Sequence, residues 1–348
     1  MDHNACMRGR LPSIEAIDAG LPGPYDGTGV EDPWFLPEAE DEGAFALLTA
    51  PARGLVAAAD WRAAEADLAV QLADLAFDAG RLTERLRNAG SGAVQRLALE
   101  EAAAVSWWTG DRVGTDRLAL WLSYRIGAAA EGGEALIRTA WAARRLMAAA
   151  STGVRSTVED LLGAEGRGDG ILAEEVASVL DSLAGVSPIT RSCAAFHLWR
   201  SLDERPDHLR GLEAAVLGAR LAGQGRLAFL PLTLTGFGAL TASGAPAARL
   251  SAWIGGSHRA VLAALMSLDR MVEWRARANA ATDDLQGRTP SRLIDALAAC
   301  PMLGAAQAEA ETGASRAAVL RNLDTLSARG LVREVTGQGR FRVWAAKL

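Results

Sequence analysis

The chain has 348 residues, of which 50% are hydrophobic but only 5% aromatic, and its formal net charge is −6. This length is enough for two domains and a sizeable core, and the abundance of alanine and leucine favours helix over sheet. The negative net charge argues against a protein that coats nucleic acid along its full length.

The cysteines and the apolar segments argue against the secreted and membrane-bound classes. Cys6, Cys193 and Cys300 lie far apart and form no CxxC motif, which disfavours a disulfide framework or a zinc site and indicates a reducing cytoplasm. The first residues lack the apolar core of a signal peptide. The longest uncharged run, 227–248, is interrupted by prolines and glycines, so we expect no membrane span and no membrane partner.

The first part of the chain is predicted to be an arm followed by a mainly α, multi-helix domain. Residues 1–40 are rich in proline, glycine and acidic side chains, which predicts an extended or disordered arm. Apolar residues then recur at helical spacing over 41–285, which predicts an all-helical domain. The first helix is expected at 42–58, and the second begins at Asp60 as its N-cap and ends at Gly80 as a helix breaker. Further helices are expected at 93–108, 115–130, 134–150, 171–183, 188–202, 209–222, 247–253 and 257–281. Residues 151–170 are polar and glycine-rich, which predicts a loop or hinge.

The segment 286–348 has the most specific pattern of the chain. Leu293, Ile294 and Leu297 mark one face of a short helix that Pro301 ends, and a second helix is expected over 305–312. Gly313 and Ala314 then predict a tight turn, because glycine tolerates the left-handed conformation that ends a helix.

A third helix and a hairpin follow this turn. Ser315 is a suitable N-cap for a helix over 316–329, with Val319, Leu323 and Leu326 on its buried face and Gly330 after its end. Residues 331–336 and 341–345 flank a glycine-rich tip and predict a β-hairpin. Helix, helix, turn, helix and hairpin is the order of a winged helix-turn-helix.

This pattern predicts binding to double-stranded DNA. A helix N-terminus suits a phosphate, an arginine in the major groove can bind guanine through two hydrogen bonds, and a basic wing reaches the backbone or the minor groove. From Ser291 onward the sequence has eight basic and five acidic side chains, so this segment has a net charge of +3. Since the whole chain has a net charge of −6, residues 1–290 have a net charge of −9. The candidate DNA-binding residues are Ser315, Arg316, Ala317, Arg321, Arg333, Gln338, Arg340 and Arg342.

Two observations leave other functions open for this segment. A winged helix can also serve only to pack on another domain or to dimerise. Leu320 lies where recognition helices often expose a small polar residue, and its apolar side chain counts against base readout.

Motifs for catalysis are missing from the sequence. There is no P-loop, dinucleotide fingerprint, HExxH or GxSxG, so we predict no catalytic residue, no metal and no cofactor. His197 lies on an apolar helix and is expected to be a satisfied core histidine, whereas His208 is expected at a solvated helix start. Trp107 and Trp108 are expected to be core anchors. The pairs Glu100-Glu101 and Glu174-Glu175 are expected near helix starts or on solvated faces, without a histidine partner for a metal.

The C-terminal motifs also carry a family resemblance. The strings GASR at 313–316 and REVTGQGRFRVW at 333–344 resemble the C-terminal domain of an alphaproteobacterial, often plasmid-borne family of unknown function. That family couples a helical domain to a C-terminal helix-turn-helix DNA-binding domain. The resemblance runs from about residue 40 to the end and is most specific at the C-terminus.

The layout is also distantly similar to Fic proteins, which transfer adenylyl groups. The string FHLW at 196–199 would be the helix before the Fic loop, and the loop would fall near 204–211. The His-Pro-Phe and the Gly-Asn-Gly-Arg of that loop are missing, as is the inhibitory motif expected near 105–110. The similarity therefore implies a descendant without catalytic activity, from which no active-site residue is carried over.

Three functions follow from these observations. The first is a DNA-binding transcriptional regulator whose helical body either dimerises or senses an effector. The second is a Fic-like nucleotidyl-transferring enzyme whose divergent loop rebuilds an anion site with Arg205 and Arg210. The third is a scaffold or partitioning accessory protein whose winged helix contacts protein.

Overall fold

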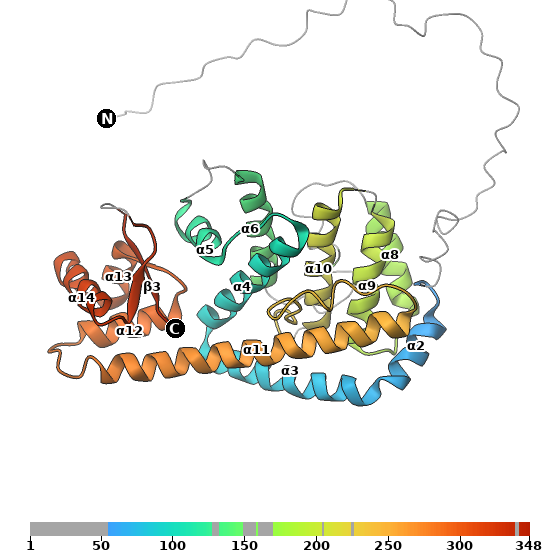
Figure 1. Cartoon of the computed structure of the whole chain (residues 1–348), viewed down its shortest axis with the longest axis horizontal. Helices are drawn as coiled ribbons and strands as arrows, with labels where there is room; N and C mark the ends of the chain where they lie inside the picture. The colour runs from blue at the N-terminus through green and yellow to red at the C-terminus, as the bar shows by residue number, and fades with distance from the viewer. Residues whose placement is uncertain are drawn as a thin grey trace, which may run out of the picture. The chain divides into compact units, whose positions relative to one another are not determined.

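The computed structural model describes residues 55–126, 132–148, 158, 170–203, 205–223, 226–337 and 341–348, all within one compact unit, Ala44–Leu348. The predicted arm over 1–40 lies outside the described residues, as do nearly all of the predicted helix over 42–58 and of the predicted loop over 151–170. The described part is mainly helical (Figure 1), as predicted. None of its helices combines the length and the apolar character that crossing a membrane requires.

The helices of the first part follow the predicted order. Figure 1 shows α3 and α11 side by side. The salt bridges Asp78–His258 and Arg85–Asp269 join them, and because the residue numbers rise together the two helices run parallel. The bounds are α2 Ala58–Asp67, α3 Ala69–Ala89, α4 Ser91–Thr109, α5 Thr115–Tyr124, α6 Gly133–Met147, α8 Gly170–Ser182, α9 Pro188–Leu202, α10 Asp207–Gly223 and α11 Pro246–Ala280.

Local signals explain several of these bounds. Pro188 is the first residue of α9, where its missing N–H costs nothing, and the Ser187 hydroxyl caps the helix by accepting from the Thr190 backbone N–H at 3.1 Å. Gly110 adopts a left-handed conformation and ends α4 as predicted. The predictions for α4, α6, α8, α9 and α10 are confirmed to within a few residues.

Other predicted bounds are wrong. Gly80 lies inside α3 and does not break it; no atom lies within 4 Å of its Cβ position, and a solvated glycine costs a helix only about 1 kcal/mol. Asp60 lies inside the first turn of α2 and is not its cap. The helix that begins at Thr115 ends at Tyr124, before the predicted residue 130, because Arg125 turns left-handed with φ 57°.

The predicted helices at 247–253 and 257–281 are one helix, α11. The pair Gly255-Gly256 does not interrupt it. A Cβ on Gly256 would lie 2.5 Å from the backbone nitrogen of Ala239, so this glycine is where the segment before α11 approaches the helix. The glycine therefore reflects close packing rather than a helix end.

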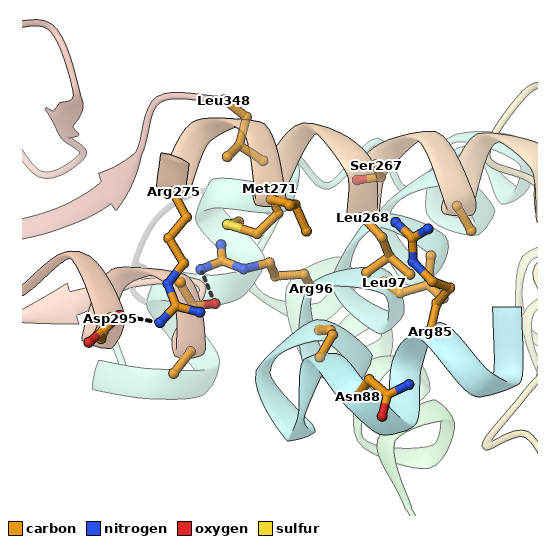
Figure 2. Close-up of a pocket in the computed structure, with 16 residues that line it drawn as sticks. Arg85, Asn88, Arg96, Leu97, Ser267, Leu268, Met271, Arg275, Asp295 and Leu348 are labelled. Carbon is orange, nitrogen blue, oxygen red and sulfur yellow. Dashed lines mark hydrogen bonds and ion pairs between the residues drawn. The ribbon is translucent and has the colours of Figure 1, made fainter. Parts of the chain in front are cut away.

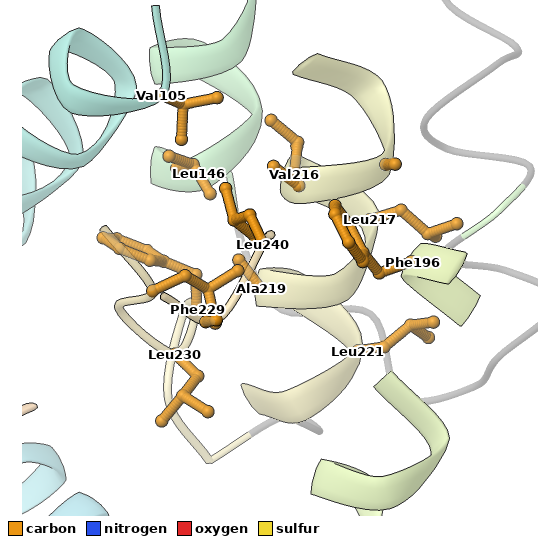
Figure 3. Close-up of a cluster of buried hydrophobic side chains, with 14 of the residues drawn as sticks. Val105, Leu146, Phe196, Val216, Leu217, Ala219, Leu221, Phe229, Leu230 and Leu240 are labelled. Atoms are coloured by element: carbon orange, nitrogen blue, oxygen red, sulfur yellow. The ribbon is translucent and has the colours of Figure 1, made fainter. Parts of the chain in front are cut away.

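The main core lies among α2 to α11. Five of its aromatic side chains are fully buried, and burial of one such side chain stabilises a fold by roughly 1.5–3 kcal/mol; they are Trp61, Phe196, Trp199, Phe229 and Trp253. Figure 3 shows part of this cluster: Leu240 of the segment before α11 lies near Leu146 of α6, and Leu217 of α10 lies beside Phe196 of α9.

The C-terminal elements form a second cluster. They are α12 Thr289–Ala299, β1 Leu303–Gly304, α13 Ala305–Thr312, α14 Arg316–Ala328, β2 Val332–Glu334 and β3 Val343–Ala346. The strands form an antiparallel sheet in the order β1-β3-β2, with Leu303 opposite Trp344 and Val332 opposite Ala346. The three helices and the hairpin were predicted; β1 was not, because two residues carry no recognisable strand pattern.

The long helix α11 reaches into both clusters. Its middle part packs in the main core, whereas Trp274 near its end is fully buried with the C-terminal elements and donates from Nε1 to the carbonyl of Leu331 at 2.8 Å. The C-terminal elements touch the body elsewhere too. The Tyr124 hydroxyl of α5 accepts from the Gly304 N–H at 2.6 Å, which ties β1 to the body.

Candidate functional site

The predicted recognition helix, α14, is fixed by local signals at its start and by burial on one face. Gly313 ends α13 with φ 66°, and the Ser315 hydroxyl caps α14 by accepting from the Ala318 N–H at 3.4 Å. Val319, Leu323 and Leu326 are fully buried, as predicted. The opposite face is therefore left to solvent, and it holds the four exposed candidates Ser315, Arg316, Ala317 and Arg321.

The two arginines on this face differ in their surroundings. Arg316 is 62% exposed and pairs with Glu309 of α13 at 3.1 Å, a surface contact of the kind that stabilises a fold by less than about 1 kcal/mol. The side chain of Arg321 is exposed, and within the described part of the chain it makes no ion pair. Leu320 is half-buried against the C-terminal cluster, so it does not cover the exposed face with an apolar side chain.

The two described arginines of the hairpin, Arg333 and Arg342, are held by carboxylates. Arg342 donates to Glu334 at 2.7 Å, pairs with Asp324 of α14 at 3.0 Å and lies over the ring of Trp344 at 4.8 Å. The hydrogen bond to Glu334 raises the pKa of this guanidinium. Arg342 therefore links the hairpin to α14. Gln338 and Arg340, the candidates at the tip, lie outside the described residues.

Arg333 points to the body instead of joining this group. Its guanidinium donates two hydrogen bonds of 2.7 Å to Asp116 in the first turn of α5, and these bonds raise its pKa. The structure thus brings Ser315, Arg316, Ala317 and Arg321 together, with Arg342 beside them. It uses Arg333 to hold β2 against α5.

Arg292 lies next to the turn that precedes α14, although the sequence analysis did not predict it as a DNA-binding residue. Its Nη1 donates to the carbonyl of Thr312 at 2.6 Å, at the end of α13, and lies 3.7 Å from the Cβ position of Gly313. A basic residue at a helix C-terminus stabilises the unpaired carbonyls there. No local pattern indicated this, because Arg292 and Thr312 are twenty residues apart.

The prediction that Glu101 lies near a helix start or on a solvated face is wrong, because Glu101 is buried in the middle of α4. Its side chain is 1% exposed, and its carboxylate accepts from the backbone N–H groups of Leu232 at 2.9 Å and Thr233 at 3.0 Å. Burial raises its pKa to about 7, against the lowering effect of the two backbone donors. The carboxylate holds the segment before α11 onto α4. Because the carboxylate is buried and accepts from the backbone of another segment, its role in the described structure is to hold these two parts together.

His197 is buried, as predicted, but not satisfied. Its Nδ1 lies 2.7 Å from Nη1 of Arg249, so it accepts there, while Nε2 has no partner among the described residues. Burial, with the nearby charges of Arg249 and Arg200, lowers its pKa to about 3. A histidine held neutral in this way and enclosed by core residues is a poor general base.

The described tryptophans differ in burial. Five are fully buried and anchor the two cores: Trp61, Trp199, Trp253, Trp274 and Trp344. Trp108, predicted as a core anchor, is half-buried and packs against the main core. Trp107 is 54% exposed on α4, with the guanidinium of Arg112 5.9 Å from its ring, so its prediction as a core anchor is wrong.

The region where a Fic-like loop was considered offers no free anion site among its described side chains. Arg205 donates to both Asp203 and Glu213, and Arg210 donates to Asp207 at 2.7 Å. His208 lies in the first turn of α10. No group of three metal-ligating side chains is found in the part of the chain that the structure describes.

Comparison with known proteins adds no family to this picture. No protein-family model matches the chain. A search of the curated proteins likewise gives no match.

Proposed function

We propose that the chain is a DNA-binding protein, a transcriptional regulator, that binds double-stranded DNA through residues 286–348 folded as a winged helix-turn-helix. The observation that carries the proposal is the order α12-β1-α13-α14-β2-β3 with the sheet order β1-β3-β2. In this arrangement α14 follows a tight turn, buries one face and leaves the other to solvent beside the hairpin. The same proposal includes membership in the alphaproteobacterial family of helical proteins with a C-terminal helix-turn-helix domain, which the strings at 313–316 and 333–344 resemble.

The exposed face of α14 supplies the contacts to the major groove. Ser315 and the free N–H groups of the first turn suit a phosphate, and Arg321, in the second turn of α14, is proposed to reach base edges. Arg316 first has to leave Glu309. Because both side chains are on the surface, this exchange costs less than about 1 kcal/mol, which a phosphate contact offsets.

The hairpin supplies the wing. Gln338 and Arg340 belong to its tip and are proposed to contact the DNA backbone. Arg342 contributes its charge at the base of the wing, where Glu334 and Asp324 hold it beside α14. Arg333 is assigned to anchoring the wing on α5 rather than to DNA.

A pull-down of genomic DNA with the full chain, followed by sequencing, tests the proposal and yields the bound sites. Fluorescence anisotropy on a recovered duplex, at one fixed salt concentration, then compares Arg321→Ala with Arg144→Ala. Arg144 is the control because it is an exposed arginine on α6 of the body. We expect Arg321→Ala to weaken binding by about 1–3 kcal/mol and to relax sequence preference, and Arg144→Ala to leave the affinity unchanged. Equal losses in the two variants contradict the assignment of α14 to the major groove.

A further inference from the structure

A cavity lies where the helical body meets the C-terminal elements (Figure 2). Its volume is about 340 Å³, and its lining comes from α3, α4, α11 and α12 together with Leu348. Three of these helices belong to the body, whereas α12 belongs to the C-terminal cluster. Cavities that hold small organic molecules have volumes of roughly 300–1,000 Å³, so this one has room for a small ligand.

The wall of the cavity is largely apolar, and its charged side chains are three arginines and Asp295. Leu97, Leu268 and Met271 face the same space in Figure 2, together with alanines of α4, α11 and α12. Two of the three lining arginines are neutralised. Arg85 pairs with Asp269, and Arg275 donates to Asp295 at 2.6 Å.

Arg96 is the third arginine; among the described residues it makes no salt bridge, and Glu100, one turn along α4, acts on its charge only electrostatically. Its guanidinium donates to the carbonyls of Leu297 and Cys300, with Ala298 at 3.4 Å, at the C-terminal end of α12. Those carbonyls lack partners within the helix, so the contact caps α12 from another helix. The Nε of Arg96 is buried and has no hydrogen-bond partner in the described structure.

This position removes most of the water from a positive charge. Burial lowers the pKa of Arg96 to about 10, against the raising effect of the nearby Cys300 and Glu100. An unpaired guanidinium beside an apolar wall is complementary to a molecule that is apolar over most of its length and anionic at one end.

We infer that the cavity binds a small organic carboxylate with an aliphatic or aromatic body, whose carboxylate is held by Arg96 and whose body packs against Leu97, Leu268 and Met271. The paired guanidiniums of Arg85 and Arg275 lie at the same cavity without being the anchor. The site thereby gives the helical body a sensing role.

The position of the cavity also couples the ligand to the C-terminal elements, a second step that rests on the proposed DNA binding. Arg96 holds the end of α12, and Gly92 one turn earlier lies so close to α12 that its Cβ position is 1.5 Å from the carbonyl oxygen of Ala299. A ligand carboxylate that binds Arg96 competes with the carbonyls of α12 for the guanidinium and so changes the contact between α4 and α12. Its binding therefore changes the affinity for DNA, and DNA changes its affinity in return.

Calorimetry on the full chain tests the first step without DNA. The probes are 4-phenylbutyrate and its uncharged analogue 4-phenylbutanamide, which share the apolar body and differ in the charged group. We expect the carboxylate to bind at least about tenfold more tightly, as a charge-assisted contact requires. Equal binding of the two probes, or binding of neither, overturns the inference.

Two variants locate the anchor. Arg96→Met should abolish the preference for the carboxylate, whereas Arg275→Met, which removes an arginine already paired with Asp295, should keep it. Equal effects overturn the role of Arg96. Because Arg96 also caps α12, a third variant leaves Arg96 in place: Ala298→Phe fills the cavity from α12 and should abolish binding of 4-phenylbutyrate. Unchanged binding to Ala298→Phe overturns the location.

Anisotropy with a bound duplex, with and without saturating 4-phenylbutyrate, tests the second step. A shift in DNA affinity that is present in the wild type and absent in Ala298→Phe supports the coupling. An unchanged DNA affinity with the probe bound overturns the coupling. Failure of the chain to bind any duplex contradicts the proposed function instead, and the calorimetry still decides the cavity on its own.

Discussion

Replacing Glu101 with glutamine should remove one defined component of the pH dependence of stability. Glu101 is buried on α4 and accepts from the backbone N–H groups of Leu232 and Thr233. Glutamine keeps a carbonyl oxygen for these donors and cannot ionise. The comparison therefore isolates the titration of the carboxyl group from its packing.

The sign follows from the two protonation states. Burial raises the pKa of Glu101 from 4.5 to about 7, so the folded state binds this proton more tightly than the unfolded state does. The stabilisation is fully present below about pH 4.5 and is lost as the pH rises through about 7. Since one pKa unit corresponds to about 1.4 kcal/mol, the loss amounts to about 3 kcal/mol.

The titration of His197 changes stability with pH in the opposite direction to that of Glu101. The pH dependence of the wild-type stability alone therefore does not isolate Glu101. Burial lowers its pKa from 6.5 to about 3, so its contribution to stability is lost as the pH falls through that range. The two effects partly cancel between about pH 4.5 and 6.5. The difference between wild type and Glu101→Gln removes the contribution of His197, which both proteins share.

Urea unfolding followed by circular dichroism measures this difference between about pH 5 and pH 8. The stability of wild type relative to Glu101→Gln should fall by roughly 2–3 kcal/mol across that range. Glu84→Gln, an exposed carboxyl on α3, is the control and should track wild type. A parallel pH dependence of wild type and Glu101→Gln refutes the reasoning, because it means that Glu101 has an ordinary pKa.

Three further experiments test how the C-terminal elements are held. Gly92→Ala should destabilise the fold by about 1–3 kcal/mol in urea unfolding, because its Cβ would lie 1.5 Å from the Ala299 carbonyl oxygen; an unchanged midpoint contradicts this. Ser315→Ala should lower stability by about 1 kcal/mol through loss of the cap, and a neutral result in thermal unfolding counts against the cap. A double-mutant cycle on Asp116 and Arg333, whose side chains are 47% and 44% exposed, should give a coupling below about 1 kcal/mol; a coupling of several kcal/mol contradicts this.

The parts of the fold that the sequence predicted are those with local causes. Gly313 takes a positive φ, Ser315 caps α14 and Val319 is buried because each depends on neighbours within a few residues. Pro188 likewise begins α9. These signals were sufficient to place all four exposed candidates on α14.

The parts that the sequence did not predict depend on residues far apart in the chain. Gly256 lies inside a continuous helix because Ala239 packs on it. Glu101 is buried because the backbone at Leu232 reaches it, 131 residues away. Arg333 looked free for DNA, yet Asp116 holds it across 217 residues. Charge and spacing alone cannot reveal such partners.

The salt dependence of DNA binding tests the central claim most directly. The affinity of the full chain for a duplex recovered from the genomic pull-down is measured by anisotropy over a range of salt concentrations. Three or four arginine–phosphate contacts predict a slope of about −3 to −4 in a plot of log affinity against log salt, and the double variant Arg340→Ala, Arg342→Ala should flatten it by about two units. An affinity that does not change with salt, or no binding to the duplex, contradicts the account.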